Sequence, residues 1–186
     1  MKRLFLAIPL SPEPALLALL QSLSSALDYE RINWVKPANM HLTLKFLGPT
    51  TDEKIPEIVA LINNCVRDVK PFDLQFDKTG IFGSRYQPRV LWLGLSEEPE
   101  QLNPLANSII DGMDNIGFKR DRQNFVPHLT LGRINKLTDK PRFQEVIGSI
   151  PQKIYISTSV DKLLLYESIL RKDGPEYRVI ESFKIG

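Results

Sequence analysis

The 186-residue sequence is poor in residues that build covalent or metal-bound frameworks, with one cysteine, Cys65, and two histidines. A single thiol cannot close an internal disulfide or make a metal cluster, so we expect a protein of a reducing compartment, the cytoplasm. The sequence also contains no Gly-x-Ser-x-Gly nucleophile elbow and no glycine-rich phosphate loop. The two histidines are therefore the strongest candidates for catalytic chemistry.

Long apolar runs and a strong net charge are also missing. The apolar segment 4–10 follows two basic residues as in a short secretory signal, but Pro12 and Pro14 come directly after it. We therefore expect no cleaved signal. No stretch approaches the ~20 apolar residues of a membrane helix, and we expect no membrane association. A net charge of +2 gives no strong global field, so any RNA-binding surface has to be local.

The tetrapeptide His-Leu-Thr-Leu occurs twice, at 41–44 and 128–131, and the two copies hold both histidines. Side chains alternate along a strand, so each copy aims its His and Thr at one face and its leucines at the other. If the two strands lie together, two imidazoles and two hydroxyls converge. One histidine in a strand is ordinarily structural, but a repeat that uses every histidine indicates a functional site.

Apolar periodicity predicts short strands that alternate with amphipathic helices. Each motif strand is followed by a helix, and no low-complexity linker separates the halves. We expect a single α+β domain, residues 1–186, of two pseudo-repeated lobes with one His-x-Thr motif per lobe. The expected helices are 12–28, 51–66, 99–113 and 139–148. The expected strands are 3–10, 32–35, 40–47, 72–76, 79–82, 90–95, 128–133, 152–158, 160–168 and 177–184, with a polar loop at 83–89 and a hairpin connection at 171–175.

Other chemistries use similar residue types. A structural metal site needs about four ligands and a catalytic zinc site three, yet neither motif contains a carboxylate or a cysteine. An aspartate recruited from elsewhere keeps a metal site open as an alternative. Thr43 and Thr130 share a face with their histidines, but a β-branched threonine in mid-strand is a poor nucleophile.

Two unliganded imidazoles suit general acid–base catalysis, since pKa values near ~6.5 allow one to be neutral and one protonated. One takes a proton from water, and the other gives one to a leaving oxygen. The two threonine hydroxyls can donate to phosphate oxygens, and Arg133 just past the second motif would add positive charge. Because side chains alternate, Arg133 would share the face of Leu129 and Leu131 in a regular strand. Its side chain can reach the site only if a β-bulge shifts the alternation or the strand has ended.

The paired motif resembles the 2H phosphoesterase superfamily, and within it the LigT-like RNA 2′,3′-cyclic phosphodiesterases of the 2′-5′ RNA ligase family. The similarity continues through 3–8, 41–48, 88–94, 125–133 and 164–170, and so covers almost the whole chain. This resemblance implies a bilobal, pseudo-symmetric fold in which two antiparallel-rich sheets line a central cleft, with helices packed outside.

The resemblance also implies residue roles, without a cofactor or metal. His41 would be the proton donor to the departing ribose 3′-oxygen, and His128 the proton acceptor that activates water, leaving an RNA 2′-phosphate. Thr43 and Thr130 would bind the phosphate oxygens. Arg133 matches the arginine that the family has three residues after the second threonine.

Substrate contacts beyond the phosphate are open at the level of sequence. The first motif has Phe46 where the second has Arg133, so the lobes are not equivalent there. Basic clusters at 85–89 and 119–122 are ordinarily solvated surface, and would track an RNA backbone only if they rim the cleft. Four aromatic residues could stack a terminal base, although each is more often core: Phe5, Trp34, Phe46 and Phe125.

The leading hypothesis is a monomeric, cytoplasmic, metal-independent enzyme that opens the 2′,3′-cyclic phosphate at RNA ends or in cyclic nucleotides. Related alternatives are 2′-5′ RNA ligation, cleavage of a 2′-5′ linkage, and hydrolysis of an ADP-ribose cyclic phosphate. A further alternative is a non-catalytic module that binds RNA or nucleotides. The intact histidines and threonines of both motifs favour an enzyme over such a module.

Overall fold

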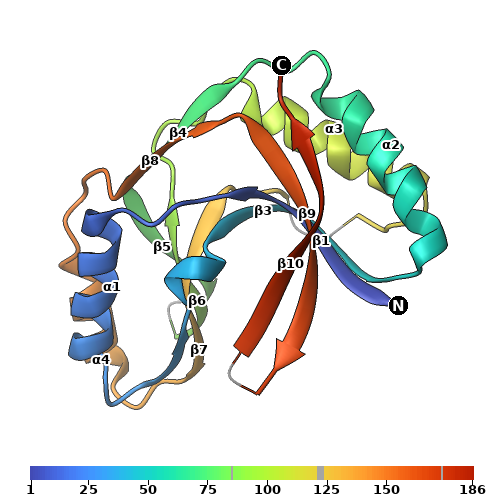
Figure 1. Cartoon of the computed structure of the whole chain (residues 1–186). Helices are drawn as coiled ribbons and strands as arrows, with labels where there is room; N and C mark the ends of the chain where they lie inside the picture. Colours follow the sequence, from blue (N-terminus) through green and yellow to red (C-terminus); the bar gives the residue numbers. More distant parts are fainter. Residues whose placement is uncertain (85, 121–123, 173) are drawn as a thin grey trace.

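Antiparallel strands build most of the structure, a computed structural model that describes residues 1–84, 86–120, 124–172 and 174–186 (Figure 1). The strands are β1 (Lys2–Pro9), β2 (Arg31–Trp34), β3 (His41–Thr50), β4 (Phe72–Phe76), β5 (Lys78–Ser84), β6 (Gln87–Gly94), β7 (His128–Lys136), β8 (Ile156–Val160), β9 (Lys162–Arg171) and β10 (Gly174–Lys184). The helices are α1 (Pro14–Ala26), α2 (Ile55–Val66), α3 (Leu102–Asn115) and α4 (Lys140–Gly148), with 3₁₀ turns at Pro37–Asn39 and Asp52–Lys54.

The two motif strands are neighbours at the centre of the main sheet. This sheet has the order β10-β9-β1-β3-β7-β6-β5, with β2 paired to the side of β7, while β4 and β8 form a separate pair. The strand pairs are antiparallel, and β3 meets β7 at one register position, Leu42 opposite Leu129. The predicted α+β class with antiparallel sheets is confirmed. The division of one domain into two repeated lobes stays a prediction.

The helices lie outside the sheet in two groups. In Figure 1, α1 and α4 lie together beside one half of the molecule, and α2 and α3 lie together beside the other. No helix within the described residues is long and apolar enough to cross a membrane. The centre of the molecule is therefore left to the two motif strands.

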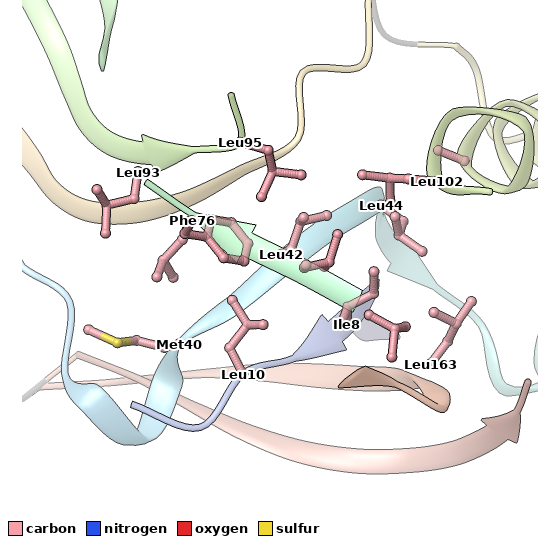
Figure 2. Packing of buried hydrophobic residues seen from close by; sticks show 14 of the residues in the cluster. Ile8, Leu10, Met40, Leu42, Leu44, Phe76, Leu93, Leu95, Leu102 and Leu163 are labelled. Carbon is pink, nitrogen blue, oxygen red and sulfur yellow. The ribbon is translucent and has the colours of Figure 1, made fainter. Parts of the chain in front are cut away.

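The leucines of both motifs belong to the core, as the alternating pattern predicts. Leu42, Leu44, Leu129 and Leu131 are buried, while the histidine and threonine of each motif are only half-buried. Figure 2 shows Leu42 and Leu44 packed among apolar side chains from several strands, including Ile8 of β1. Each fully buried leucine contributes about 1.5–3 kcal/mol of transfer free energy, which fixes the polar faces of β3 and β7 away from the core.

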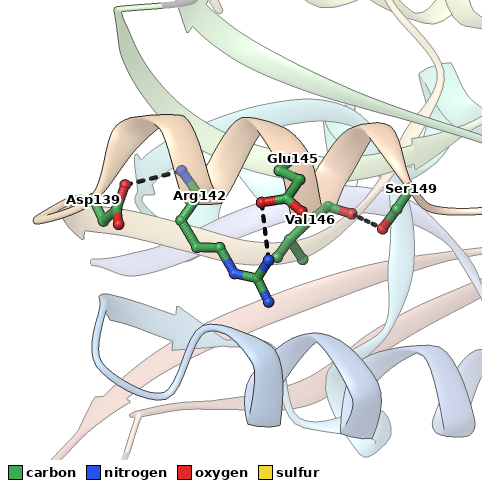
Figure 3. Close-up of polar contacts among 5 residues, drawn as sticks. All are labelled: Asp139, Arg142, Glu145, Val146 and Ser149. Carbon is green, nitrogen blue, oxygen red and sulfur yellow. Dashed lines mark hydrogen bonds and ion pairs between the residues drawn. The ribbon is translucent and has the colours of Figure 1, made fainter.

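Helix α4, predicted at 139–148, has its ends fixed by local hydrogen bonds (Figure 3). The carboxylate of Asp139 accepts the backbone N–H of Arg142 at 2.9 Å, and Arg142 pairs with Glu145 at 2.9 Å. The N–H groups of Asp139 and Thr138 donate to the buried carboxylate of Glu30, which precedes β2. These bonds tie the end of the second motif strand to the first half of the chain.

Several element boundaries differ from the predicted ones. Helix α1 begins at Pro14 rather than at Ser11 and Pro12, because the chain stays extended after β1, where the Leu10 N–H donates to the Met40 carbonyl. Strand β3 was predicted to end at Leu47 but continues through Gly48 to Thr50. Bulges in its register keep it paired with β1 over this length. Strand β8 begins at Ile156, later than the predicted 152.

The predicted polar loop at 83–89 is largely strand. β5 and β6 form a tight hairpin in which Ser84 faces Gln87, and the Ser84 hydroxyl accepts the Gln87 N–H at 3.0 Å. Gly83, which faces Pro88 next to a register shift in this pairing, has a positive φ of 101° that favours glycine. In the hairpin predicted at 171–175, Gly174 of β10 faces Arg171 of β9. Asp173 in that connection, like Arg85 and Arg122 of the basic clusters, lies outside the described residues.

Candidate functional site

The polar faces of β3 and β7 open into one cavity of about 890 Å³, here called the catalytic cavity. All five side chains singled out from the sequence line it: His41, Thr43, His128, Thr130 and Arg133. The buried leucines behind them hold the two strands in place, so the convergence follows from the alternation of the motif.

A β-bulge brings Arg133 to the same cavity. The register of β7 against β6 passes from Thr130 directly to Gly132 and skips Leu131, which is the extra residue of the bulge. Leu131 and Gly132 are consecutively buried, and the alternation is reversed beyond them. In a regular strand, a spacing of three residues from Thr130 would place Arg133 on the leucine face. The bulge shifts the alternation by one residue, so Arg133 lies on the face of Thr130 instead.

The first motif strand has the same bulge at the same place. The register of β3 against β1 passes from Thr43 to Lys45 and skips Leu44. Phe46 then takes the place that Arg133 has in the second motif, and 55% of its surface is exposed. Lys45, in the place of Gly132, is buried and donates to the Lys119 carbonyl at 2.8 Å.

Both imidazoles are oriented by backbone. His41 Nδ1 lies 2.7 Å from the carbonyl oxygen of Asn39, and His128 Nδ1 lies 2.7 Å from that of Val126. A carbonyl only accepts, so each Nδ1 carries the proton and donates it. Each Nε2 is therefore left as the reactive nitrogen, a proton acceptor when the ring is neutral and a donor when it is charged.

Aromatic rings enclose the two histidines differently. The His41 ring lies 4.9 Å from Phe5 and 5.3 Å from Tyr177, the latter edge-on. The His128 ring lies 4.7 Å from Phe82, also edge-on, and 6.4 Å from Trp92. Apolar rings around both imidazoles make their charged forms costly.

This burial lowers the pKa of both histidines. For His41, the hydrogen bond to the Asn39 carbonyl opposes that lowering, and the positive charges of Arg133 and of protonated His128 add to it. For His128, burial again has the largest effect, the bond to Val126 opposes it, and Arg133 lowers the pKa further. In the free enzyme near neutral pH, both rings are therefore mostly neutral.

The β9–β10 hairpin contributes residues that the sequence did not single out. It brings Arg171, Lys172 and Tyr177 to the catalytic cavity. Asn39 ties the hairpin to the first motif, because its side-chain amide donates to the Pro175 carbonyl at 2.8 Å while its own carbonyl holds His41. Two adjacent basic residues in a predicted turn were the only sequence signal, and nothing local shows that the turn folds over the motif strands.

The two basic clusters, which were expected to be solvated surface, lie in different places outside the catalytic cavity. Lys119 and Arg120 are exposed, and Arg120 pairs with Asp111 of α3 at 2.6 Å. Tyr86 and Arg89 line a separate cavity of about 700 Å³, next to Arg133. Neither cluster lines the catalytic cavity with its described residues. Its cationic rim comes from elsewhere: Lys36, Arg171 and Lys172.

The four aromatic candidates for base stacking differ in how far they are exposed. Phe5 is 2% exposed and belongs to the core, while Trp34 and Phe125 are half-buried. Phe46 is the most exposed of the four and lines two cavities.

The chemistry that this arrangement supports is proton transfer beside an anion. Two Nε2 atoms, two hydroxyls and one guanidinium face a common space, a set of donors that suits the oxygens of a phosphate diester. Among the described residues, no group of three or more His, Cys, Asp or Glu side chains is placed to hold a metal ion. Independence of metal stays a prediction that a chelator tests.

Comparisons with known proteins agree with this geometry. Residues 12–169 match the family model described as the 2′-5′ RNA ligase superfamily. The chain is 33% identical over 154 residues to an RNA 2′,3′-cyclic phosphodiesterase of Aquifex aeolicus, covering 82% of this chain and 81% of that protein. It is 35% identical over 147 residues to a protein of the same name from Thermotoga maritima, covering 79% and 76%. The crystal structure of E. coli LigT complexed with 3′-AMP superposes with a TM-score of 0.75 at 27% identity, covering 99% and 98% of the chains.

Proposed function

The chain belongs to the 2′-5′ RNA ligase superfamily of 2H phosphoesterases, and from that premise we propose that it hydrolyses RNA 2′,3′-cyclic phosphate ends. The observation that carries the proposal is the convergence of His41 and His128 with Thr43, Thr130 and Arg133 on one cavity. Relatives that are 33% and 35% identical over most of the chain are named RNA 2′,3′-cyclic phosphodiesterases.

In the reaction we propose, water attacks the phosphorus and the bond to the ribose 3′-oxygen breaks. Neutral Nε2 of His128 takes the proton from the attacking water, and protonated Nε2 of His41 gives a proton to the departing 3′-oxygen. The product is an RNA 2′-phosphate with a free 3′-hydroxyl. Proton transfer by a positioned side chain contributes about 10²–10⁴-fold, so neither histidine is dispensable.

Arg133 has two effects in this scheme. Its guanidinium neutralises the negative charge on the non-bridging phosphate oxygens, to which Thr43 and Thr130 donate. After burial, its charge is a further cause that lowers the pKa of both His128 and His41. An anionic phosphate bound in the same cavity has the opposite effect on both imidazoles, because it stabilises their charged forms, and His41 must be charged to donate a proton.

Product analysis by phosphorus NMR, on an RNA that ends in a 2′,3′-cyclic phosphate and with EDTA present, tests the proposal. The cyclic phosphate signal should be replaced by that of a 2′-phosphate monoester. A 3′-phosphate product would reverse the assignment of the leaving oxygen, and loss of turnover in EDTA would overturn metal-independent catalysis. An unchanged substrate signal would overturn the hydrolytic function itself.

We also propose that the chain acts as a monomer in the cytoplasm, as a single domain with one motif per lobe. The five side chains that the proposed reaction uses all belong to one chain, so the reaction needs no residue from a second copy. The single cysteine supports a reducing compartment. Light scattering coupled to size exclusion tests the first point, because a mass above the 21.2 kDa of one chain would contradict it.

A further inference from the structure

The end of the β9–β10 hairpin continues past the point where the main sheet supports it. β10 is an edge strand, and β1 pairs with β9 only between Leu164 and Glu167. Residues 169–172 and 174–176 are here called the hairpin tip. Within the described part of the chain, its two strands pair with each other and with no other strand (Figure 1). A two-stranded ribbon of this kind is marginally stable alone, so its position depends on other contacts.

Among the described residues, a single hydrogen bond joins the hairpin tip to another segment of the chain. The side-chain amide of Asn39 donates to the Pro175 carbonyl at 2.8 Å. Asn39 is half-buried and ends the 3₁₀ turn that comes directly before β3. Just beyond the tip, the ring of Tyr177 lies edge-on to His41. The tip is therefore held against the first motif and not against the second.

The same asparagine also sets the orientation of the proton donor. Its backbone carbonyl accepts the Nδ1 proton of His41 at 2.7 Å, which leaves Nε2 to face the cavity. Burial has the largest effect on the pKa of His41 and lowers it, while this hydrogen bond opposes that lowering and favours the donating form. A continuous series of contacts thus runs from the Pro175 carbonyl through both polar groups of Asn39 to the His41 ring.

The proton acceptor lacks the outer part of this series. Nδ1 of His128 donates to the carbonyl of Val126 at the same distance, 2.7 Å, and with the same spacing in the chain. The side chain of Val126 is 44% exposed and carries no polar atom, so it cannot bond to another segment. The additional contact is therefore specific to the histidine that gives a proton to the leaving oxygen.

We propose that Asn39 is a positioning residue for His41, which uses its bond to the hairpin tip to hold Nε2 of the proton donor at the leaving oxygen. This inference rests on the proposed function, because it assigns a task to one of the two proton transfers. A bound phosphate fixes where the leaving oxygen lies, so the imidazole has to be held at a matching place. A misplacement of ~1 Å in such a geometry costs about 10²-fold in rate.

The test compares two leaving groups. Adenosine 2′,3′-cyclic phosphate loses a ribose oxygen that needs a proton, whereas bis(4-nitrophenyl) phosphate loses a 4-nitrophenolate that does not. Asn39→Ala removes the side-chain amide and keeps the backbone carbonyl. Because the side chain is only half-buried, folding should be preserved.

Asn39→Ala should lower kcat for the cyclic phosphate by about tenfold, because a loosely held donor loses part of its proton-transfer rate. Its KM for the cyclic phosphate and its kcat for the aryl diester should stay within about twofold of wild type, since the groups that bind the phosphate are unchanged. In a His41→Ala background, Asn39→Ala should have no further effect on the cyclic phosphate, because the ring through which it acts is gone.

The matched control is Gln152→Ala. Gln152 is exposed and lies outside the catalytic cavity, and its side-chain amide also joins two distant segments, by donating to the Ser96 hydroxyl at 3.1 Å. This variant therefore loses the same kind of hydrogen bond without touching the hairpin tip. Its rates on both substrates should equal those of the wild type.

Three results would overturn the inference while leaving cyclic phosphate hydrolysis intact. The first is an equal loss of kcat on the two substrates in Asn39→Ala, which would indicate a general effect on the fold. The second is a wild-type rate on both substrates. The third is a further loss when Asn39→Ala is added to His41→Ala, which would mean that Asn39 acts independently of the imidazole.

If the wild type did not hydrolyse the cyclic phosphate, the proposed function would fail, and the positioning role would be tested by NMR of the imidazole nitrogens. The same measurement serves if only the aryl diester is inert. The chain has two histidines, so His41→Ala assigns both sets of signals. Asn39→Ala should move His41 from the Nδ1–H tautomer toward a mixture with the Nε2–H tautomer and leave His128 unchanged. An unchanged tautomer of His41 would overturn the inference.

Discussion

The two motif strands are alike in backbone and differ in the side chain that follows the bulge. Both carry His-Leu-Thr-Leu, both skip the last leucine in their register, and both bond Nδ1 of the histidine to a carbonyl two residues earlier. After the bulge, β7 presents Gly132 and Arg133, whereas β3 presents Lys45 and Phe46. The repeat therefore duplicates the two proton-transfer groups, but of the two cations that follow the bulges only Arg133 lines the catalytic cavity, while Lys45 is buried.

This difference separates the tasks of the two strands. On β7, Arg133 brings a positive charge to the catalytic cavity, where it adds to the burial that lowers the pKa of both histidines. On β3, the ring of Phe46 offers a stacking surface, and Lys45 fixes the segment at Lys119. A symmetric backbone can thus serve an asymmetric substrate when one residue of each strand is changed.

The largest expected effect separates the proton donor from the proton acceptor. His41→Ala and His128→Ala should each lower turnover of the cyclic phosphate by ~10³-fold or more, the combined range of proton transfer and positioning. On an aryl phosphodiester whose 4-nitrophenolate leaves without a proton, His41→Ala should regain much of its rate while His128→Ala should not. Rescue of His128→Ala instead would exchange the two roles.

The next effect concerns Arg133, the cation that β7, but not β3, brings to the catalytic cavity. Arg133→Ala should lower kcat by about 10²-fold, comparable to removing one donor from a preorganised anion site. It should also move the kcat/KM profile toward higher pH, because the charge that lowers the pKa of both histidines is gone. Arg89→Ala, an exposed arginine outside the catalytic cavity, is the control. Similar losses in the two variants would argue against a specific role for Arg133.

A smaller effect, on stability, tests the residue between the bulge and Arg133. A Cβ at Gly132 would lie 2.8 Å from Ile32 Cγ2 and 3.0 Å from Trp34 Cε3 of β2. Gly132→Ala should therefore reduce the free energy of unfolding by about 1–3 kcal/mol, measured by urea denaturation. Gly148→Ala, where a Cβ meets no atom within 4 Å, should instead gain up to about 1 kcal/mol. Equal changes at the two sites would mean that β2 does not crowd β7.

The smallest effect is a shift in pH dependence. Because burial and Arg133 lower the pKa of both histidines, and kcat/KM reports the free enzyme, its bell should be centred below the ordinary histidine value of ~6.5. The kcat profile, which reports the complex, should lie at higher pH, since the bound phosphate anion stabilises the imidazolium. Coincident profiles of kcat and kcat/KM would contradict that coupling to the substrate.

Much of the site could be predicted because it depends on local alternation. The strand period places His41 with Thr43 and His128 with Thr130, and it buries the leucines, whatever the surrounding fold. The position of Arg133 was predicted only conditionally, because a bulge is set by the pairing of β7 with β6 and not by β7 itself. The short helix α4 was predicted to within one residue of its start, where the structure shows Asp139 as the N-cap.

The rest depends on contacts between distant segments. Nothing in the sequence of the β9–β10 hairpin shows that Asn39 will bond its Pro175 carbonyl, or that Tyr177 will lie against His41. Likewise, Phe46 is exposed between two cavities, although its sequence neighbours Lys45 and Leu47 are buried. The predicted loop at 83–89 failed because the tight turn of the β5–β6 hairpin was not recognised.

The single register position that joins β3 to β7 has a consequence for folding. Leu42 and Leu129 are far apart in the chain, and closing the long intervening loop is entropically slow compared with forming local hairpins such as β5–β6 or β9–β10. The proton donor and acceptor become neighbours only when that long-range pairing forms. Catalytic activity should therefore appear late in refolding, after most secondary structure has formed, and a partly folded chain would not open the cyclic phosphate.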